Sequence, residues 1–389
     1  MRKSTGSIRT LSLLLMFAIT LVGIDTTRAA DEADSAVDVA PRIQMAILLD
    51  TSGSMRGLVN QARSELWKVV NQFATAKLGD KQPTLEVALY EYGRGTLGNE
   101  AGFMRQILPL TDDLDKVSEE LFKLEIGGSK EYCGQVIHKA AIDLKWSESN
   151  RDIKTIFIAG NEGFGQGPAD FREACSTAAN AGITVSTIFC GPNEQGVKQL
   201  WLEASRLADG SYMSINHNQQ PVAIDAPQDK QLVELNTRLN KTYVAFGSAK
   251  KREEALERQV AQDANASASS PASLATRIQS KGSHLYNNAR WDLCDACRLG
   301  KVKIEDVKVE DLPEELRKMS VEERKVHIEQ MIKEREEIQK QISSLSESRE
   351  KYVAEERKKL AANEDETLDA AIISAVRKQA ETKKFTFEK

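Results

Sequence analysis

A mainly apolar run that ends in an Asp-Thr-Ser-Gly-Ser motif constrains the fold of this chain more than any other feature. The run covers residues 43–49, the motif is Asp50-Thr51-Ser52-Gly53-Ser54, and a helix-like pattern follows at residues 58–78. A near-continuous apolar run is typical of a strand that is buried on both faces of a sheet. Because Gly53 lets the backbone turn tightly, the motif is predicted to connect a buried strand to a helix.

Strand-like and helix-like segments alternate across residues 41–217. This alternation predicts an α/β, Rossmann-like fold with a doubly wound, mostly parallel sheet of six strands. Ligands of such sheets bind beyond the carboxyl ends of the strands, which is where Asp50 follows the first predicted strand. The predicted strands are residues 43–49, 85–92, 106–110, 155–159, 184–189 and 211–215, and the predicted helices are residues 58–78, 114–124, 134–144, 169–179 and 197–207.

Asp50, Ser52 and Ser54 place one carboxylate and two hydroxyl groups on the same turn. Hard cations such as Mg²⁺ prefer oxygen ligands, keep several waters and often take only one or two carboxylates from the protein. We therefore expect a site for Mg²⁺ here, with Mn²⁺ or Ca²⁺ as alternatives. Asp and Ser are also common helix N-caps, but three oxygens at alternate positions exceed what one cap needs.

The motif, in its place within the alternation, resembles the first metal-binding loop of the von Willebrand factor type A (VWA) domain. The resemblance covers residues 41–217. It implies a Rossmann-like fold with a metal-ion-dependent adhesion site (MIDAS), in which the metal binds an acidic side chain of a protein partner. Asp50, Ser52 and Ser54 are the metal ligands that the resemblance implies in the first loop.

The second and third metal-binding loops depart from the pattern of that family. The family supplies a Thr hydroxyl after a Gly-rich turn, and the candidates here are Ser129 and Glu131. The family supplies an Asp after the fourth strand, where this chain has Asn161 followed by Glu162. A neutral Asn oxygen would weaken metal binding, unless Glu162 turns inward and restores the charge. A structural VWA scaffold with a degenerate metal site is therefore one alternative.

The N-terminal residues have the features of an export signal. Basic residues precede an apolar segment at residues 11–24, and small residues follow at 27–29, so residues 1–29 are predicted to be a cleaved signal peptide. The mature chain is then expected to be periplasmic or secreted. An uncleaved N-terminal anchor is the alternative, and no other stretch is long and apolar enough to span a bilayer. The runs at 131–134, 156–162 and 291–293 also resemble exported bacterial VWA-domain proteins with a helical C-terminal region.

The part of the chain after the predicted sheet is mainly helix-like. An Ala- and Ser-rich stretch within it favours a flexible linker. A capping box at Ser320 and Glu323 predicts the start of a long helix, which would be on the order of 60 Å long. The predicted segments are a helical region at 225–312 with the linker near 264–273, a long charged helix at 313–361, and a last helix and tail at 362–389.

The long charged helix carries an apolar seam of the kind found in coiled coils. Apolar residues recur at spacings of three and four, which favours packing against another helix. Arg335 and Arg349 occupy two positions of the seam and make it imperfect. The seam therefore predicts self-association or binding of a partner helix. Its apolar residues are Ile328, Met331, Ile338, Ile342, Leu345 and Tyr352.

Cys294 and Cys297 form the Cys-x-x-Cys pattern among the five cysteines of the chain. A thioredoxin-like redox pair needs a helix start within a βαβ unit and a lowered thiol pKa. This pair instead lies in a predicted helical segment outside the sheet. We therefore expect a structural disulfide or two buried thiols, and an exported thiol-disulfide oxidoreductase is the enzymatic alternative.

The sequence as a whole predicts an exported, non-enzymatic binding protein. Its formal net charge of -5 disfavours binding to nucleic acid. No Ser/His/Asp set with a nucleophile elbow and no Walker-type phosphate loop is recognisable in the sequence. The expected activity is capture of a protein partner through the metal at Asp50, Ser52 and Ser54.

Overall fold

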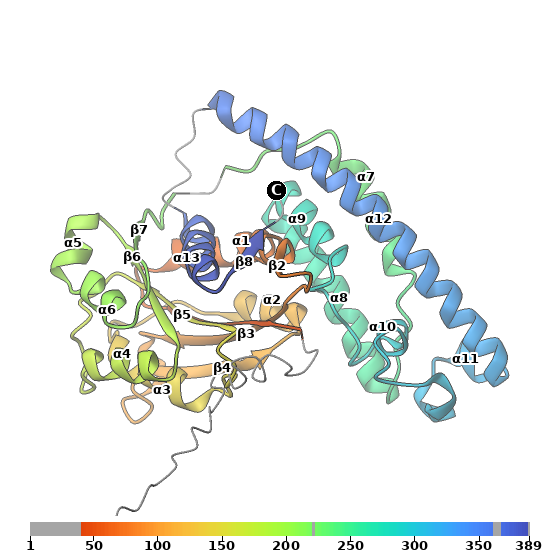
Figure 1. The fold of residues 1–389 in the computed structure, drawn as a ribbon, viewed down its shortest axis with the longest axis horizontal. Coiled ribbons are helices and arrows are strands. Elements are labelled where there is room, and N and C mark those ends of the chain that lie inside the picture. Colours follow the sequence, from red (N-terminus) through yellow and green to blue (C-terminus); the bar gives the residue numbers. More distant parts are fainter. Residues whose placement is uncertain (1–39, 220–221, 361–366, 388–389) are drawn as a thin grey trace, which may run out of the picture. The chain divides into compact units, whose positions relative to one another are not determined.

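The computed structural model describes residues 40–219, 222–360 and 367–387 (Figure 1). The predicted signal peptide at residues 1–29 lies outside the described residues. None of the helices in the described part of the chain has the length and hydropathy needed to cross a bilayer.

A six-stranded sheet occupies the N-terminal part of the described chain (Figure 1). The strand order is β4-β3-β1-β5-β6-β7, and every neighbouring pair is parallel except β3 and β4, which are antiparallel. This arrangement confirms the predicted α/β fold with a mostly parallel, six-stranded sheet. The strands are β1 (Arg42–Asp50), β3 (Thr84–Tyr92), β4 (Met104–Thr111), β5 (Ile153–Gly160), β6 (Thr184–Cys190) and β7 (Tyr212–Ile215).

Helices cover both faces of this sheet. In β1, Ile47 and Leu49 belong to the apolar cluster on one face, and Ala46 and Leu48 belong to the cluster on the other. This division follows from the two-residue period of a strand, and it explains why β1 is apolar almost throughout. One face packs against α1 (Arg56–Ala74), α2 (Leu114–Lys123) and α13 (Leu368–Thr382); the other packs against α3 (Cys133–Asp143), α4 (Phe171–Asn180) and α6 (Trp201–Leu207), with the short α5 (Asn193–Lys198) before α6.

The last helix and strand of the chain return to the sheet domain. Ile372 and Val376 of α13 are buried in the same apolar cluster as Phe73 of α1. The terminal strand β8 (Phe385–Phe387) pairs antiparallel with β2 (Ala76–Leu78), which directly follows α1. The helical region is therefore inserted between β7 and the helix that completes one face of the sheet.

The Ala- and Ser-rich stretch at residues 264–273 is helical, and the prediction of a linker there is wrong. The helix α8 (Ala249–Ser269) runs through most of it, and α9 (Pro271–Lys281) begins after a single residue. Ala is the strongest helix former, and Pro is favoured in the first turn of a helix. Ser270 caps α9, since its hydroxyl accepts a hydrogen bond from the backbone N–H of Ser273 at 2.9 Å.

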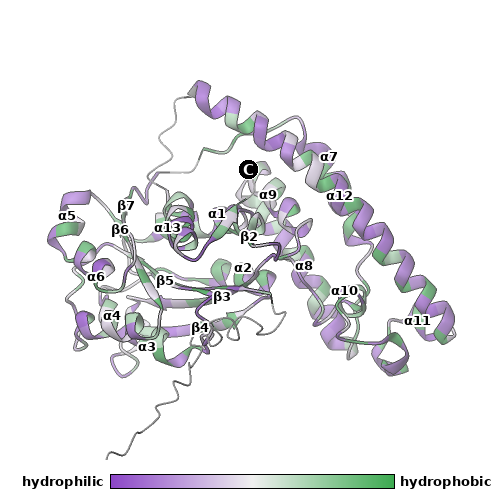
Figure 2. Cartoon of the chain, in the orientation of Figure 1, coloured by the Kyte–Doolittle hydropathy of each residue, from purple (hydrophilic) through white to green (hydrophobic). Residues whose placement is uncertain are grey.

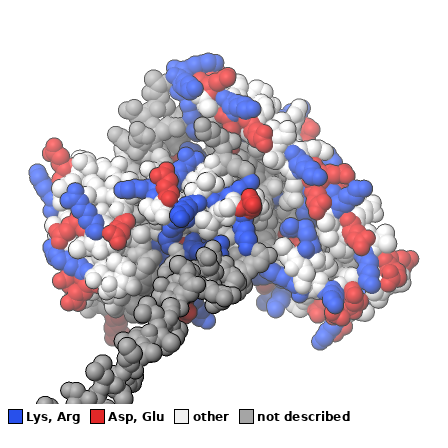
Figure 3. All heavy atoms as spheres, viewed as in Figure 1, with Lys and Arg blue, Asp and Glu red and all other residues white. Residues whose placement is uncertain are grey.

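The long helix α12 (Val321–Leu360) packs its seam against helices of the same chain. Ile328 is buried with Leu293 and Leu316, and Ile338 is buried with Leu232 and other residues of the neighbouring helices. Hydrophilic residues dominate the rest of α12 (Figure 2), and acidic and basic side chains alternate along it (Figure 3). The seam that predicted self-association is thus filled within the chain. The helices around α12 are α7 (Asp229–Asn240), α9, α10 (Leu293–Arg298) and the one-turn α11 (Glu314–Arg317).

Buried charged groups join the helical region to the sheet domain. Arg277 of α9 is fully buried and donates to Asp115 of α2 at 2.7 Å and to Asp263 of α8 at 2.6 Å. Its guanidinium also lies over the ring of Trp67 of α1, 4.6 Å from the ring centroid. Tyr286 donates a hydrogen bond to the other carboxylate oxygen of Asp115 at 2.6 Å. Because these buried groups satisfy one another's hydrogen bonds, their contacts fix the position of α9 on α1 and α2.

The side chain of Gln61 in α1 forms hydrogen bonds with the backbone just before and just after the inserted helical region. Its amide donates to the carbonyl oxygens of Asn216 (3.1 Å) and Gln219 (2.8 Å), and its carbonyl accepts from the backbone N–H of Leu368 (2.9 Å). We expect Gln61→Met to lower the free energy of unfolding by about 1–3 kcal/mol, because the buried N–H of Leu368 and the part-buried carbonyls of Asn216 and Gln219 lose their partner. Urea denaturation measures this loss. The substitution Asn60→Met, at an exposed neighbour on α1, is the control, and an equal effect of both would contradict the role of Gln61.

Candidate metal centre

The side chains of the first predicted metal-binding loop meet on one turn at the carboxyl end of β1. Asp50 and Ser52 are buried, and Ser54 is exposed. The carboxylate oxygen Oδ1 of Asp50 accepts a hydrogen bond from the backbone N–H of Ser52 at 2.7 Å. The hydroxyl oxygens of Ser52 and Ser54 lie 3.4 Å apart. One carboxylate and two hydroxyl groups therefore converge before α1 begins at Arg56.

The loop after β5 brings Asn161 to the same place. The hydroxyl of Ser54 donates to the side-chain oxygen of Asn161 at 3.4 Å. Glu162 is exposed, and its backbone carbonyl accepts a hydrogen bond from the indole N–H of Trp201 at 2.8 Å. Of the two residues predicted for the third loop, Asn161 is thus the one in contact with the first loop.

The second loop contributes Glu131 rather than Ser129. Glu131 is buried and interacts with the hydroxyl of Ser52, whereas Ser129 is exposed on the surface of the loop. Backbone hydrogen bonds hold the two loops together, from Gly53 N–H to Gly128 O at 3.2 Å and from Gly127 N–H to Thr51 O at 2.9 Å. Gly128 has a φ of +108°, a conformation that favours glycine.

The electrostatics of the loops favour a cation. Burial, with a further contribution from the nearby carboxylates of Glu131 and Glu162, raises the pKa of Asp50 to about 7, although the hydrogen bonds from Ser52 lower it. Burial also raises the pKa of Glu131, with the charge of Glu162 as a further cause. Carboxylates gathered in a buried site repel one another, and a divalent cation between them would offset both the repulsion and the loss of water.

Asp50 also has a carboxylate oxygen without a partner. Its Oδ2 atom is buried, and no described residue donates a hydrogen bond to it. Such an atom is costly to bury. Glycine surrounds the carboxylate: a Cβ atom on Gly93 would lie 2.5 Å from Oδ1, and a Cβ atom on Gly160 would lie 3.0 Å from Oδ2. The unpaired oxygen and the all-oxygen donor set fit a hard divalent cation.

Sequence reasoning missed the residues that shape the floor of the site. Gly93 follows β3 and Gly160 ends β5, so the two glycines flank Asp50 from the neighbouring strands. Tyr92 donates a hydrogen bond to the carbonyl oxygen of Ala159, the residue before Gly160, at 3.0 Å. Thr51 donates to the buried Glu91 at 3.3 Å and so ties the motif to β3. A glycine after each of two apolar strands was the signal available in the sequence.

Residues 44–210 match the family model of the von Willebrand factor type A domain. This part of the chain is a VWA domain. The match lies within the predicted domain at residues 41–217 and contains all three loops described above. None of the curated proteins compared with the chain matches it.

Three similar solved structures each cover less than half of this chain. BatB, a conserved hypothetical protein from Bacteroides thetaiotaomicron, is 17% identical over 44% of this chain and 90% of its own, with a TM-score of 0.34. An aerotolerance-related membrane protein from Bacteroides fragilis NCTC 9343 is 16% identical over 45% of this chain and 93% of its own, with a TM-score of 0.30. The VWA domain of SpRpn10 is 18% identical over 46% of this chain and 88% of its own, with a TM-score of 0.32.

Cys294 and Cys297 lie outside the VWA domain and do not have the surroundings of reactive thiols. Both are free thiols. Burial raises the pKa of Cys294 to about 12, and burial also raises the pKa of Cys297. The thiolate is the reactive form, so these surroundings favour inert thiols over redox chemistry. The nearby Arg335, a cation that could lower a thiol pKa, forms its ion pairs with the carboxylates of Asp292 and Asp295.

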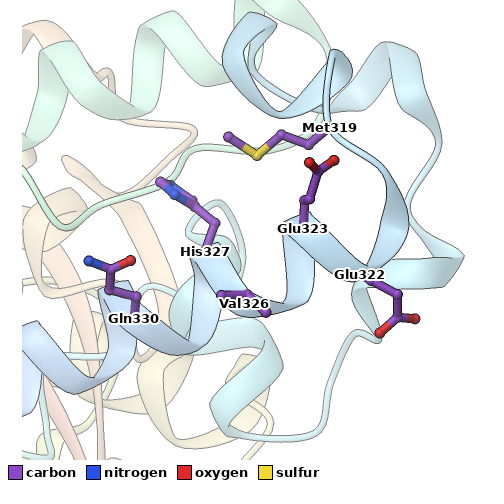
Figure 4. A pocket seen from close by; sticks show the side chains of 6 residues that line it. All are labelled: Met319, Glu322, Glu323, Val326, His327 and Gln330. Carbon is purple, nitrogen blue, oxygen red and sulfur yellow. The ribbon is translucent and has the colours of Figure 1, made fainter.

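A hollow of about 400 Å³ lies outside the VWA domain, at the start of α12 (Figure 4). Glu323 and His327 point toward Met319, and Glu322 points away from it (Figure 4). Glu323 is already engaged, since its carboxylate accepts from the backbone N–H of Ser320 at 2.7 Å as a helix cap.

Across the described ranges, no group of three His, Cys, Asp or Glu side chains is placed to hold a metal. A metal in the VWA loops would therefore also need the Ser hydroxyls and the Asn161 oxygen.

Proposed function

We propose that the VWA domain binds a divalent cation and uses it to hold an acidic side chain of a protein partner. Mg²⁺ is the proposed ion, with Mn²⁺ and Ca²⁺ as alternatives. The observation that carries the proposal is the buried, unpartnered oxygen of Asp50 beside the hydroxyls of Ser52 and Ser54. These oxygens lie at the carboxyl end of β1, where ligands of doubly wound sheets bind.

The ligand set explains why the cation would seek an outside carboxylate. Asp50, Ser52, Ser54 and Asn161 would hold the ion, with Glu131 close enough to balance part of its charge. Asn161 supplies a neutral oxygen, so the protein would neutralise less of the metal charge than a site with an additional Asp. A cation that keeps positive charge and an exchangeable water attracts a carboxylate from another molecule.

The proposed mode of action is binding after export, without catalysis. The basic and apolar pattern of residues 1–29 supports export, and the partner would then be a periplasmic or extracellular protein. The raised thiol pKa values of Cys294 and Cys297 give no support to an oxidoreductase. The helical region would carry the VWA domain.

Metal-dependent capture tests this function. We expect the immobilised full chain to retain a protein from an envelope extract in Mg²⁺ and to release it in EDTA. Asp50→Ala should lose the retention, because the remaining ligands carry too little charge to hold the ion. Asp80→Ala, at an exposed Asp outside the loops, is the control and should retain the protein. Retention that persists in EDTA and in Asp50→Ala would refute metal-dependent binding and favour a structural scaffold.

A further inference from the structure

We propose that the partner's acidic residue is flanked by uncharged polar residues, which bind in an amide-lined hollow next to the metal loops. This inference rests on the proposed function, since the hollow extends the same site. The amide hollow is defined by the loops that follow β5, β6 and β7. It determines which partner sequences fit around the carboxylate that the metal holds.

The amide hollow is continuous with the metal loops. Asn161 and Glu162 line it, and Asn161 also accepts the hydrogen bond from Ser54 at 3.4 Å. The hollow has a volume of about 660 Å³, which lies within the range of sites that enclose small ligands. A peptide whose carboxylate reaches Ser54 would therefore pass over Asn161, and its next residues would meet the hollow.

Carboxamide side chains dominate the polar lining of the amide hollow. Each carboxamide offers both a donor and an acceptor, which complements peptide groups and the side chains of Asn, Gln, Ser and Thr. The carbonyl oxygen Oε1 of Gln199 is buried, and no described residue donates to it. The amide residues of the lining are Asn161, Asn193, Gln195, Gln199, Asn216 and Asn218.

The charge of the lining disfavours a second acidic group. Glu162 is the only carboxylate among the described residues that line the hollow. His217 also lines it, and no Lys or Arg does. A second carboxylate or a phosphate would lie near Glu162 without a cationic side chain to balance it. The partner segment is therefore expected to carry one acidic residue for the metal and neutral polar residues beside it.

Apolar neighbours are disfavoured for a different reason. An apolar group placed in the amide hollow would take water away from the carboxamides and leave their donors and acceptors unpaired. A site built to hydrogen-bond its ligand discriminates strongly against a ligand that lacks those groups. The expected preference is thus for Asn, Gln, Ser or Thr over Leu as well as over Asp and Glu.

A library of short peptides, each with one fixed Asp and varied neighbours, tests the preference. The immobilised full chain is loaded in Mg²⁺, and bound peptides are eluted with EDTA and sequenced. We expect enrichment of Asn, Gln, Ser and Thr over Asp, Glu and Leu by about tenfold at a position next to the fixed Asp. Uniform composition at every varied position would overturn the inference and leave the proposed metal-dependent function standing.

Variants of α5 separate the hollow from the metal. In the double variant Asn193→Ala/Gln195→Ala, two exposed amides of the lining are removed, so the enrichment should fall from about tenfold toward onefold while EDTA-sensitive retention remains. Glu194→Ala/Lys198→Ala changes exposed residues of the same helix outside the lining and should keep the enrichment. Enrichment that survives the first variant overturns the inference. Failure of the unmodified chain to retain any peptide in Mg²⁺ overturns it together with the proposed function.

Discussion

Asp50→Asn is expected to weaken Mg²⁺ binding by about 100-fold or more, because the variant removes the carboxylate charge at the centre of the loops. The same substitution should stabilise the metal-free chain by about 1 kcal/mol. Asn keeps the oxygen that accepts from Ser52, and it replaces the unpartnered Oδ2 of Asp50 with a neutral amide that is less costly to bury. A residue kept for binding at the expense of stability would show both effects together.

Isothermal titration calorimetry with Mg²⁺ or Mn²⁺ measures the first effect, and urea denaturation in EDTA measures the second. Ligand binding to the folded state also raises the midpoint of unfolding, so added Mg²⁺ should shift the unmodified chain and leave Asp50→Asn unchanged. Asp80→Asn, at an exposed acid, is the control and should behave like the unmodified chain. Equal Mg²⁺ affinity of Asp50→Asn and the unmodified chain would remove Asp50 from the metal site.

Arg335→Met is expected to lower the free energy of unfolding by about 3–5 kcal/mol. Arg335 of α12 is buried, and its Nη1 atom donates to Asp292 at 2.6 Å and to Asp295 at 3.0 Å. Its Nη2 atom donates to the carbonyl oxygen of Thr242 at 2.6 Å, and its guanidinium lies 4.5 Å from the ring centroid of Tyr243. Met fills a similar volume but leaves both carboxylates buried without their cation.

Urea denaturation of Arg335→Met and Lys250→Met gives the comparison. Lys250 pairs with Glu254 on the surface of α8, where the two side chains are 84% and 52% exposed. Exposed pairs of this kind contribute at most about 1 kcal/mol, so the control should unfold almost as the unmodified chain does. Losses of the same size in both variants would contradict the assignment of Arg335 as the central cation of a buried cluster.

The first metal loop could be predicted because its ligands are adjacent in sequence. Asp50, Ser52 and Ser54 share one turn, and the apolar strand before them fixes where that turn lies in the sheet. The second loop could not be assigned in this way. The orientation of Glu131 and Ser129 depends on the backbone at Gly128, which has a positive φ. Gly128 is also held by a hydrogen bond from Gly53, which is distant in sequence.

The packing of α12 could not be predicted from its periodicity. A stripe of apolar residues at spacings of three and four indicates which face is buried, but the same stripe suits a second copy, a partner helix or the chain's own helices. Arg335 and Arg349 were interpreted as imperfections of the seam. They instead pair with Asp292, Asp295 and Asp229, which lie far away in sequence.

The position of α13 has a consequence for the order in which the chain acquires its structure. The sheet ends with β7 at Ile215, but the helix that covers part of its apolar face starts at Leu368. During synthesis, when β7 has just left the ribosome, the chain exposes the apolar surface that Ile372 and Val376 cover in the folded protein. That surface stays open until nearly the whole polypeptide has left the ribosome. A fragment truncated after β7 would keep it exposed permanently and is expected to aggregate.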